Sequence, residues 1–204
     1  MSDINTLISQ LKQYDAAYAE GDSPVSDKDY DTLRRKAEAM DPGNAYFANV
    51  GSDVRGGKEK LPYTMGSLDQ VYDQKEWDNW VKTYDLKGKN VVISDKQDGI
   101  SAMLIYRHGL FEKAYSRGNG MEGADISRHV RAVPSVPQTV DGFSYLVVRG
   151  ELIMEKSVFE AKYAQQYKNP RNFVAGAFNR SKTPVGVLED ISFIAYQVVA
   201  FSES

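Results

Sequence analysis

The spacing of apolar residues changes between about residues 84 and 91 of this chain, and this change restricts the fold more than any other feature. Up to about residue 84, apolar residues recur every three or four positions, as they do on one side of a helix. Between residues 91 and 201 many of them form short runs rich in β-branched and aromatic residues, which is typical of strands, and two helical stretches separate the last two runs. We therefore expect an α+β fold with helices first and a mainly antiparallel sheet after them.

The first part of the sequence has the pattern of two helices joined by a short loop. Helical spacing extends over residues 4–18 and again over residues 26–40, with Ser26 and Asp29 placed as in a capping box. Residues 44–62 are rich in glycine and charge, which favours a linker. We predict a helical unit over residues 1–60 and a second domain over residues 61–204.

The second part combines helices with strands. Asp73 can cap a helix that Gly88 closes. The stripe that we expect this helix to bury consists of Trp77, Trp80, Val81 and Tyr84. The expected strands are residues 91–94, 100–106, 111–116, 145–154 and 191–201, with a hairpin turn at 107–109 and further helices at 156–166 and 172–179.

Composition excludes several classes of function. The chain has no cysteine and two histidines, His108 and His129, which excludes disulfides, thiolate nucleophiles and a zinc centre built by this chain alone. A net charge of -3 gives no global attraction to nucleic acid, so any DNA contact must be local. The sequence contains no apolar run long enough for a membrane span, and we expect a cytoplasmic protein without membrane contact.

Lys96-Gln97-Asp98-Gly99 follows the strand expected at residues 91–94. Lys96 and Asp98 are two positions apart, so an extended backbone points both side chains to one face. A lysine held beside a sheet can lose hydration, and its neutral amine is then a nucleophile toward a carbonyl or phosphorus centre. An ordinary surface loop explains the same residues.

Two arginine-containing segments lie in or after predicted strands. The glycine-rich loop from Arg117 to Gly123 lets the backbone approach a ligand, and Arg117 offers a charged fork for phosphate. Arg149 and Glu151 share one face of a strand, where each needs a partner or a polar cavity. A mobile loop and an exposed sheet face are the corresponding alternatives.

The remaining candidates lie at helix starts. Asn169 and Pro170 suit a helix entrance that holds an anion, with Arg171 directed toward it. A solvated helix face explains this arginine equally well. The residues that bracket the turn of the helical hairpin, and that suit a cationic heterocycle or a ribose, are Tyr18, Asp27, Tyr30 and Asp31. An ordinary hairpin core is the alternative.

Taken together and in this order, these segments resemble the NAD+-dependent DNA ligases of bacteria and their viruses. The matching segments are Val25 to Asp31, Gly66 to Asp69, Lys96 to Gly99, Arg117 to Gly120, Arg149 to Glu151 and Asn169 to Asn172. The resemblance covers nearly the whole chain. It implies a helical NAD-binding subdomain followed by an incomplete, mainly antiparallel nucleotidyltransferase domain of the ATP-grasp-like DNA ligase type.

The resemblance also implies a mechanism. Lys96 attacks the adenylate phosphorus of NAD+, forms lysyl-AMP and releases nicotinamide mononucleotide, with Mg2+ assisting. Asp98 and Glu151 hold the lysine and the ribose hydroxyls, and Arg117 and Arg171 contact ribose or phosphate. The residues implied near adenine are Ser67, Leu68, Ser94 and Asp95. The residues implied to grip the nicotinamide mononucleotide half, and so to select NAD+ over ATP, are Tyr18, Asp27, Tyr30 and Asp31.

Three positions depart from the family pattern. Ser94 replaces a glutamate, Ala19 replaces a histidine and Asn179 replaces an arginine. Asp95 lies next to Ser94 and is placed to take over part of adenine recognition.

The family also has later nucleotidyltransferase motifs with two lysines, an OB-fold, a zinc module and helix-hairpin-helix repeats, which this sequence does not show. We therefore expect one piece of a split or truncated ligase that acts on nicked double-stranded DNA with a second polypeptide or C-terminal region. The alternatives are another lysine-dependent nucleotidyltransferase, of the RNA ligase or capping type, and a non-catalytic subunit of a replication or repair complex.

Overall fold

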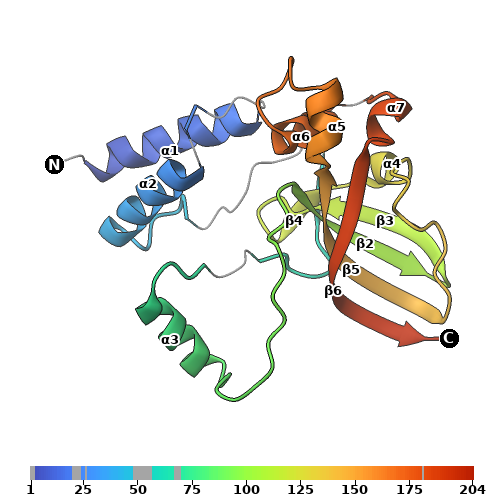
Figure 1. Cartoon of the computed structure of the whole chain (residues 1–204), viewed down its shortest axis with the longest axis horizontal. Helices are drawn as coiled ribbons and strands as arrows, with labels where there is room; N and C mark the ends of the chain where they lie inside the picture. Colours follow the sequence, from blue (N-terminus) through green and yellow to red (C-terminus); the bar gives the residue numbers. More distant parts are fainter. Residues whose placement is uncertain (1–2, 20–23, 26, 48–56, 67–69, 181) are drawn as a thin grey trace. The chain divides into compact units, whose positions relative to one another are not determined.

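The computed structural model describes residues 3–19, 24–25, 27–47, 57–66, 70–180 and 182–204. The chain divides into a larger unit, made of Met1–Met65 and Asp98–Ser204, and a smaller unit, Gly66–Gln97. No helix in the described ranges is both long and apolar enough to cross a membrane. Helices and antiparallel sheets occur together (Figure 1), which confirms the expected α+β class.

Two helices form the N-terminal hairpin. α1 covers Ile4–Ala19 and α2 covers Asp27–Met40, close to the predicted ranges. The hairpin has its own core because residues three or four apart lie on one face of a helix. Its buried residues are Leu7, Ile8, Leu11 and Ala37. Ser26, the predicted cap of α2, lies outside the described residues.

Four antiparallel strands form the main sheet, in the spatial order β3-β2-β5-β6. They are β2 (Ile100–Arg107), β3 (Leu110–Ser116), β5 (Phe143–Met154) and β6 (Ile191–Glu203). β2 and β3 are joined at His108 and Gly109, whose φ angles of 48° and 73° are those of a tight hairpin turn. These strands and this turn were predicted from the sequence and are confirmed.

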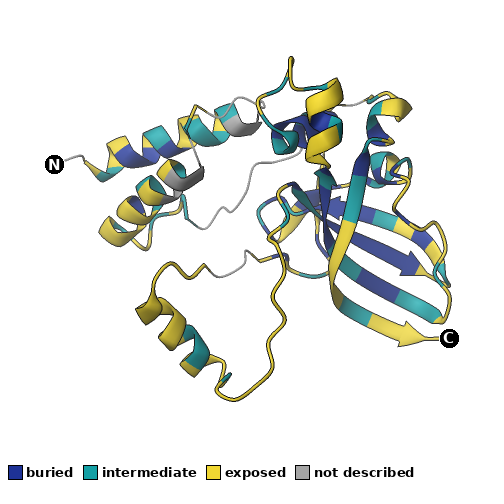
Figure 2. Ribbon diagram, viewed as in Figure 1, coloured by how far each residue is buried: buried dark blue, intermediate teal, exposed yellow. Residues whose placement is uncertain are grey.

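Helices cover one face of this sheet. They are α4 (Ser127–Val130), α5 (Lys156–Lys162), α6 (Pro170–Asn179) and α7 (Val185–Leu188). Their apolar side chains pack with those of the sheet into one core, in which Leu104, Leu152 and Phe178 are fully buried. The sheet strands and α6 carry much of the buried colour in Figure 2. The sequence predicted α5 and α6 but neither α4 nor α7, because a helix of four residues is too short to show a helical period.

The opposite face of the sheet is partly covered by the segment that contains Leu61 and Met65. Both side chains are buried against apolar residues of β2, β3 and β5. Directly before them, β1 (Lys58–Lys60) pairs with β4 (Glu122–Ala124). The linker predicted over residues 44–62 therefore ends in a strand, because pairing with β4 satisfies the backbone of a segment whose side chains are all exposed.

α3 (Gln74–Thr83) is the helix of the smaller unit. Asp73 caps it as predicted, with its Oδ1 accepting a hydrogen bond from the first turn at 2.8 Å. The prediction that its aromatic stripe is buried is wrong, since no residue of α3 is buried and Trp77 is 45% exposed. The stripe instead packs against itself, with ring centroids 5.3 Å apart for Trp77 and Trp80 and 5.8 Å apart for Trp80 and Tyr84.

Candidate functional site

A cluster of polar side chains lies on the sheet face opposite the helices α4–α7. Ser101 on β2 is directly opposite Glu151 on β5, and Ser101 Oγ donates a hydrogen bond to Glu151 Oε2 at 2.9 Å. Arg149 lies two positions before Glu151, so strand alternation turns both side chains to one face, as the sequence predicted. Arg149 Nη1 donates to Gln197 Oε1 on β6 at 3.2 Å. Glu151 is only 8% exposed. Its carboxylate is therefore buried within a polar network.

Tyr196 enters this cluster through an irregularity in β6. Gly150 pairs with Ala195 and the preceding Arg149 pairs with Gln197, so Tyr196 is one extra residue in the β6 ladder. Such a β-bulge bends the strand and redirects a side chain. Strict alternation through this segment would have placed Tyr196 and Gln197 on opposite faces.

The side chains around Tyr196 determine its electrostatics. Its hydroxyl is hydrogen-bonded to Ser101 and lies near the charges of Glu151, Arg149 and Arg117. Burial, followed by the negative charge of Glu151, raises the pKa of Tyr196, whereas the Ser101 hydrogen bond and the two arginines lower it in part. The phenol is therefore neutral at physiological pH. We call these five residues, Ser101, Arg117, Arg149, Glu151 and Tyr196, the polar face.

The residue between Arg149 and Glu151 must be a glycine, because β6 comes very close to β5 at this position. A Cβ atom at this position would lie 2.3 Å from the ring of Phe193 and 2.4 Å from the carbonyl oxygen of Ile194. Those distances are far below van der Waals contact, so only glycine lets β6 approach β5 closely at the bulge.

Asp98 and Arg171 form an ion pair in the larger unit. Arg171 Nη1 donates to Asp98 Oδ1 at 3.0 Å, and the two side chains are 26% and 61% exposed. Next to Asp98, Gly99 allows the backbone to approach β5 closely. A Cβ atom at Gly99 would lie 2.0 Å from the carbonyl oxygen of Leu152. Burial lowers the pKa of the Arg171 guanidinium.

The start of α6 places Arg171. Asn169 is the N-cap, and its side-chain oxygen accepts a hydrogen bond from the backbone nitrogen of Asn172 at 2.8 Å. Pro170 is in the first turn, where its fixed φ angle suits a helix start and its missing N–H costs nothing. The predicted helix entrance is confirmed, and Arg171 points from it to a carboxylate.

The loop that follows β3 is fixed by its own hydrogen bonds. The backbone nitrogen of Arg117 donates to the carbonyl oxygen of Ser101 at 3.2 Å. The side chain of Asn119 accepts hydrogen bonds from the backbone nitrogens of Met121 and Glu122, at 3.0 and 2.7 Å. The backbone that carries Arg117 is therefore held in a defined turn at the edge of the polar face.

Lys96, Ser94 and Asp95 belong to the smaller unit, and all three are exposed. The prediction of a strand over residues 91–94 is wrong, since these residues have no assigned secondary structure and Val92 is 98% exposed. A β-rich run forms a strand only when another strand satisfies its backbone groups. The described part of the smaller unit contains one helix and no strand.

Tyr30 is held within the helical hairpin. Its hydroxyl donates to Asp15 Oδ1 at 2.7 Å and lies 3.0 Å from the hydroxyl of Tyr46, which donates to Asp15 Oδ2 at 2.7 Å. Burial, together with the nearby Asp15 carboxylate, raises the pKa of Tyr30 to about 12. The hydroxyl is therefore committed to a carboxylate.

The other candidate residues of this kind lie outside what the structure describes. These are the side chains of Tyr18, Asp27 and Asp31, and the residues Ser67 and Leu68.

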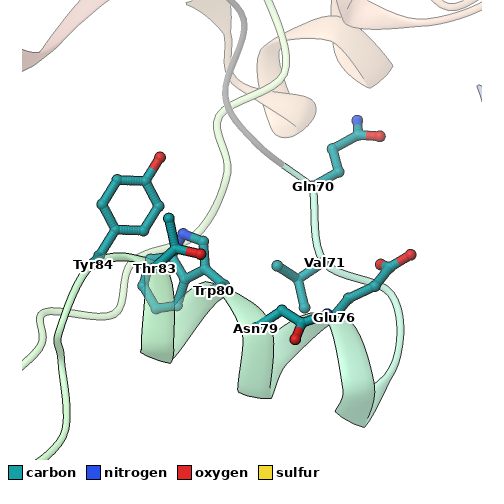
Figure 3. Close-up of a pocket in the computed structure, with 7 residues that line it drawn as sticks. All are labelled: Gln70, Val71, Glu76, Asn79, Trp80, Thr83 and Tyr84. Atoms are coloured by element: carbon teal, nitrogen blue, oxygen red, sulfur yellow. The ribbon is translucent and has the colours of Figure 1, made fainter.

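A shallow pocket of about 350 Å³ lies along α3 in the smaller unit (Figure 3). Its described lining residues are Gln70, Val71, Glu76, Asn79, Trp80, Thr83 and Tyr84. Glu76 already accepts a hydrogen bond from the backbone nitrogen of Tyr72 at 2.8 Å. Because the described lining offers neither a lysine nor an arginine, this pocket lacks the charge that a phosphate group needs.

Within the described residues, no three histidine or acidic side chains come close enough together to hold a metal ion. The carboxylates of Asp98 and Glu151 are instead engaged by Arg171 and Ser101.

Two members of the polar face were not identified from the sequence. The sequence indicates a role for Ser101 only through its position two residues after Gly99. A serine within a strand usually faces solvent and does not by itself indicate a site. Tyr196 lies within an apolar run that predicts a strand correctly but does not reveal the bulge. The ladder register, rather than the motif, brings both residues to Glu151.

Comparison with known proteins gives a consistent family. The family described as "NAD-dependent DNA ligase adenylation domain" matches residues 58–204. A DNA ligase of Acanthamoeba polyphaga mimivirus is 35% identical over 97% of this chain and 31% of its own length. A DNA ligase of Shewanella denitrificans is 32% identical over 95% of this chain and 32% of its own length. This chain thus spans about a third of the length of these relatives.

Proposed function

Because this chain belongs to the family of NAD-dependent DNA ligase adenylation domains, we propose that it transfers the adenylyl group of NAD+ to its own Lys96. The observation that carries the proposal is the Arg171–Asp98 ion pair. Asp98 is two residues after Lys96 in the sequence, and the ion pair lies in the same unit as the polar face. The sheet is then the front part of an ATP-grasp-like nucleotidyltransferase domain.

The proposed reaction is a displacement at phosphorus. The amine of Lys96 loses a proton to solvent, and its lone pair forms an N–P bond to the adenylyl phosphorus. The bond from that phosphorus to the bridging oxygen breaks, and the electron pair leaves with nicotinamide mononucleotide. The product is a lysyl-AMP phosphoramidate. Since such a reaction needs little covalent help, positioning and charge stabilisation provide most of the catalysis.

The described side chains suggest a role for each charged residue. Arg117 and Arg171 are planar guanidinium groups suited to phosphate or ribose oxygens. Glu151 accepts hydrogen bonds and is suited to ribose hydroxyls, while Asp98 holds Arg171. In this proposal, the two guanidinium groups stabilise the negative charge that develops during the displacement.

The helical hairpin is proposed to bind the nicotinamide mononucleotide half through Tyr18, Asp27, Tyr30 and Asp31. The contacts of Tyr30 support this, because its committed hydroxyl fixes the ring for stacking on a flat heterocycle. Ser67, Leu68, Ser94 and Asp95 are proposed to lie around adenine.

Mg2+ is proposed to accompany the phosphates of NAD+ rather than a protein cage. The described residues do not form such a cage, and Mg2+ commonly keeps water and binds through substrate phosphates. We assign no step of the displacement to the metal.

Transfer of AMP to the 5′-phosphate of nicked double-stranded DNA, and sealing of the nick, are proposed for a larger assembly. The relatives are DNA ligases about three times as long as this chain. We propose that the later nucleotidyltransferase motifs and an OB-fold are contributed by a further region or a second polypeptide.

Nucleotide choice tests this function. The chain is incubated with Mg2+ and either NAD+ or ATP, and released nicotinamide mononucleotide or pyrophosphate is measured together with protein-bound AMP. Release of nicotinamide mononucleotide in proportion to bound AMP is the expected result. Labelling from ATP alone would instead favour a nucleotidyltransferase of the RNA ligase or capping type.

A further inference from the structure

We propose that Ser101 is a positioning residue that holds the Glu151 carboxylate and the Tyr196 hydroxyl in one arrangement for nucleotide binding. This inference rests on the proposed function, because it assumes that Glu151 contacts NAD+. It concerns a residue that lies outside the charged motifs and acts through two neighbours.

The first support is the register of the sheet. Ser101 and Glu151 are cross-strand partners on β2 and β5, and Ser101 Oγ lies 2.9 Å from Glu151 Oε2. Glu151 is 8% exposed, and a carboxylate with so little access to water requires hydrogen-bond donors from the protein. A serine with a fixed backbone position supplies such a donor in one defined direction.

The second support is Tyr196, which reaches the same hydroxyl from the other side. Its hydrogen bond to Ser101 exists only because the β6 bulge brings the ring to the polar face. A hydroxyl group has one donor site and two acceptor sites, so Ser101 can hold both partners at once. Three strands, β2, β5 and β6, are thus connected through one oxygen atom.

The chemistry of the site explains why such a connection is useful. Glu151 shares its strand face with Arg149, and the charges of Glu151, Arg149 and Arg117 all act on Tyr196. Without a fixed donor, the Glu151 carboxylate is free to turn toward an arginine rather than toward a ribose. We infer that Ser101 holds the carboxylate in the orientation that suits the ribose hydroxyls.

Equilibrium binding of NAD+ is the test, measured by calorimetry on the full chain carrying Lys96→Ala, which prevents turnover. Ser101→Ala in this background is expected to weaken NAD+ affinity about tenfold, the usual effect of losing a hydrogen bond to a charged group. Ser101→Thr keeps the hydroxyl and is expected to restore the affinity.

Ser144→Ala is the matched control. Ser144 is on β5 near its far end, and its hydroxyl donates to the carbonyl oxygens of Ser202 and Glu203 at 3.2 and 3.1 Å. This substitution removes a hydroxyl that also bridges two strands, and NAD+ affinity is expected to stay unchanged. If both alanine variants weaken binding equally, Ser101 has only a structural role and the proposal fails.

A double substitution separates positioning from simple loss of a contact. If Ser101 acts through Tyr196, then Ser101→Ala with Tyr196→Phe weakens binding by less than the product of the two single effects. If the Lys96→Ala chain, which is the reference, binds NAD+ equally well with and without Ser101→Ala, the proposed role of Ser101 is wrong and the proposed function is unaffected. Absence of NAD+ binding by the reference chain would overturn the proposed function itself.

Discussion

The guanidinium of Arg171 lies 3.0 Å from the carboxylate of Asp98, although the two residues are 73 positions apart in the chain. This ion pair connects the first turn of α6 to the segment that directly follows Lys96. The helix cap at Asn169 and the close approach of Gly99 to β5 fix its two ends. The pair therefore joins α6 to the segment that leads into β2.

Replacing Arg171 should lower the rate of lysyl-AMP formation. Arg171→Ala removes a charged fork suited to phosphate and leaves Asp98 without this partner, so we expect a loss of about a hundredfold. Arg171→Lys keeps the charge but not the planar geometry and should recover only part of the rate. Single-turnover adenylation measures both.

Arg180→Ala is the control for this prediction. Arg180 is at the other end of α6, where its Nη2 donates to the hydroxyl of Tyr167 at 2.8 Å. Its removal should leave adenylation within about twofold, as expected for a group that does not contact the transition state. An equal loss in both variants would mean that α6 needs arginine only for its packing.

Gly150→Ala should destabilise the larger unit strongly. The added Cβ would overlap the ring of Phe193 and the backbone of Ile194, and relief requires β6 to move away from β5. Overpacking of this kind costs about 1–3 kcal/mol or more in the free energy of unfolding. Urea denaturation followed by circular dichroism measures the loss.

Gly186→Ala is the matched control in α7. Among the described residues, no heavy atom beyond the neighbouring residues and the helix's own backbone lies within 4 Å of a Cβ at Gly186, and alanine is the better helix former by about 1 kcal/mol. Its free energy of unfolding should therefore be unchanged or slightly higher. If Gly150→Ala were equally neutral, the close approach at the bulge would not exist in solution.

The sheet was predictable because its determinants are local. The β2–β3 hairpin follows from a short run of turn residues between two β-rich runs, and the cap of α6 follows from Asn169 and Pro170. The shared face of Arg149 and Glu151 follows from alternation alone. In each case the sequence within about ten residues contains the whole signal.

The failures have a common cause, since each depends on residues distant in sequence. The run over residues 91–94 has strand-forming residues but no described partner strand, and the stripe on α3 has helical spacing but no cover. Tyr196 reaches the polar face through a bulge set by its pairing with β5. Propensity and periodicity contain no information about such partners.

The stability of the larger unit should fall as the solution becomes acidic, in part through His129. Burial, reinforced by the positive charge of Arg128, lowers the pKa of His129 below 6.5, although a hydrogen bond with the backbone of Arg180 opposes this. The unfolded chain therefore takes up the proton first as pH falls below about 6.5. The free energy of unfolding decreases until the folded histidine is also protonated.

Chemical denaturation of the wild type and His129→Gln at several pH values measures this effect. The variant has no imidazole to titrate, so the difference in stability between the two proteins should change between pH 7 and the folded pKa. A constant difference across this range would contradict the assigned environment of His129.

Tyr30 should bind nicotinamide mononucleotide through its ring rather than its hydroxyl. Tyr30→Phe should therefore retain most of the affinity for NAD+, whereas Tyr30→Leu should lose it. Both variants remove the hydrogen bond to Asp15, which should cost about 1–2 kcal/mol of stability, and Tyr30→Leu should lose more because the ring packs on the hairpin core. NAD+ affinity and thermal unfolding, measured on the same samples, separate the two effects. Equal affinity of the two variants would exclude stacking.

The most direct test is the intact mass of the chain after incubation with NAD+ and Mg2+. We expect the wild type to gain one adenylyl group, and Lys96→Ala to gain none. Lys89→Ala is the matched control, since Lys89 is an exposed lysine of the same unit that pairs only locally with Asp85 at 3.1 Å, and it should be labelled like the wild type. An adenylyl group on Lys96→Ala, or its absence from the wild type, would contradict self-adenylation at Lys96 by this chain.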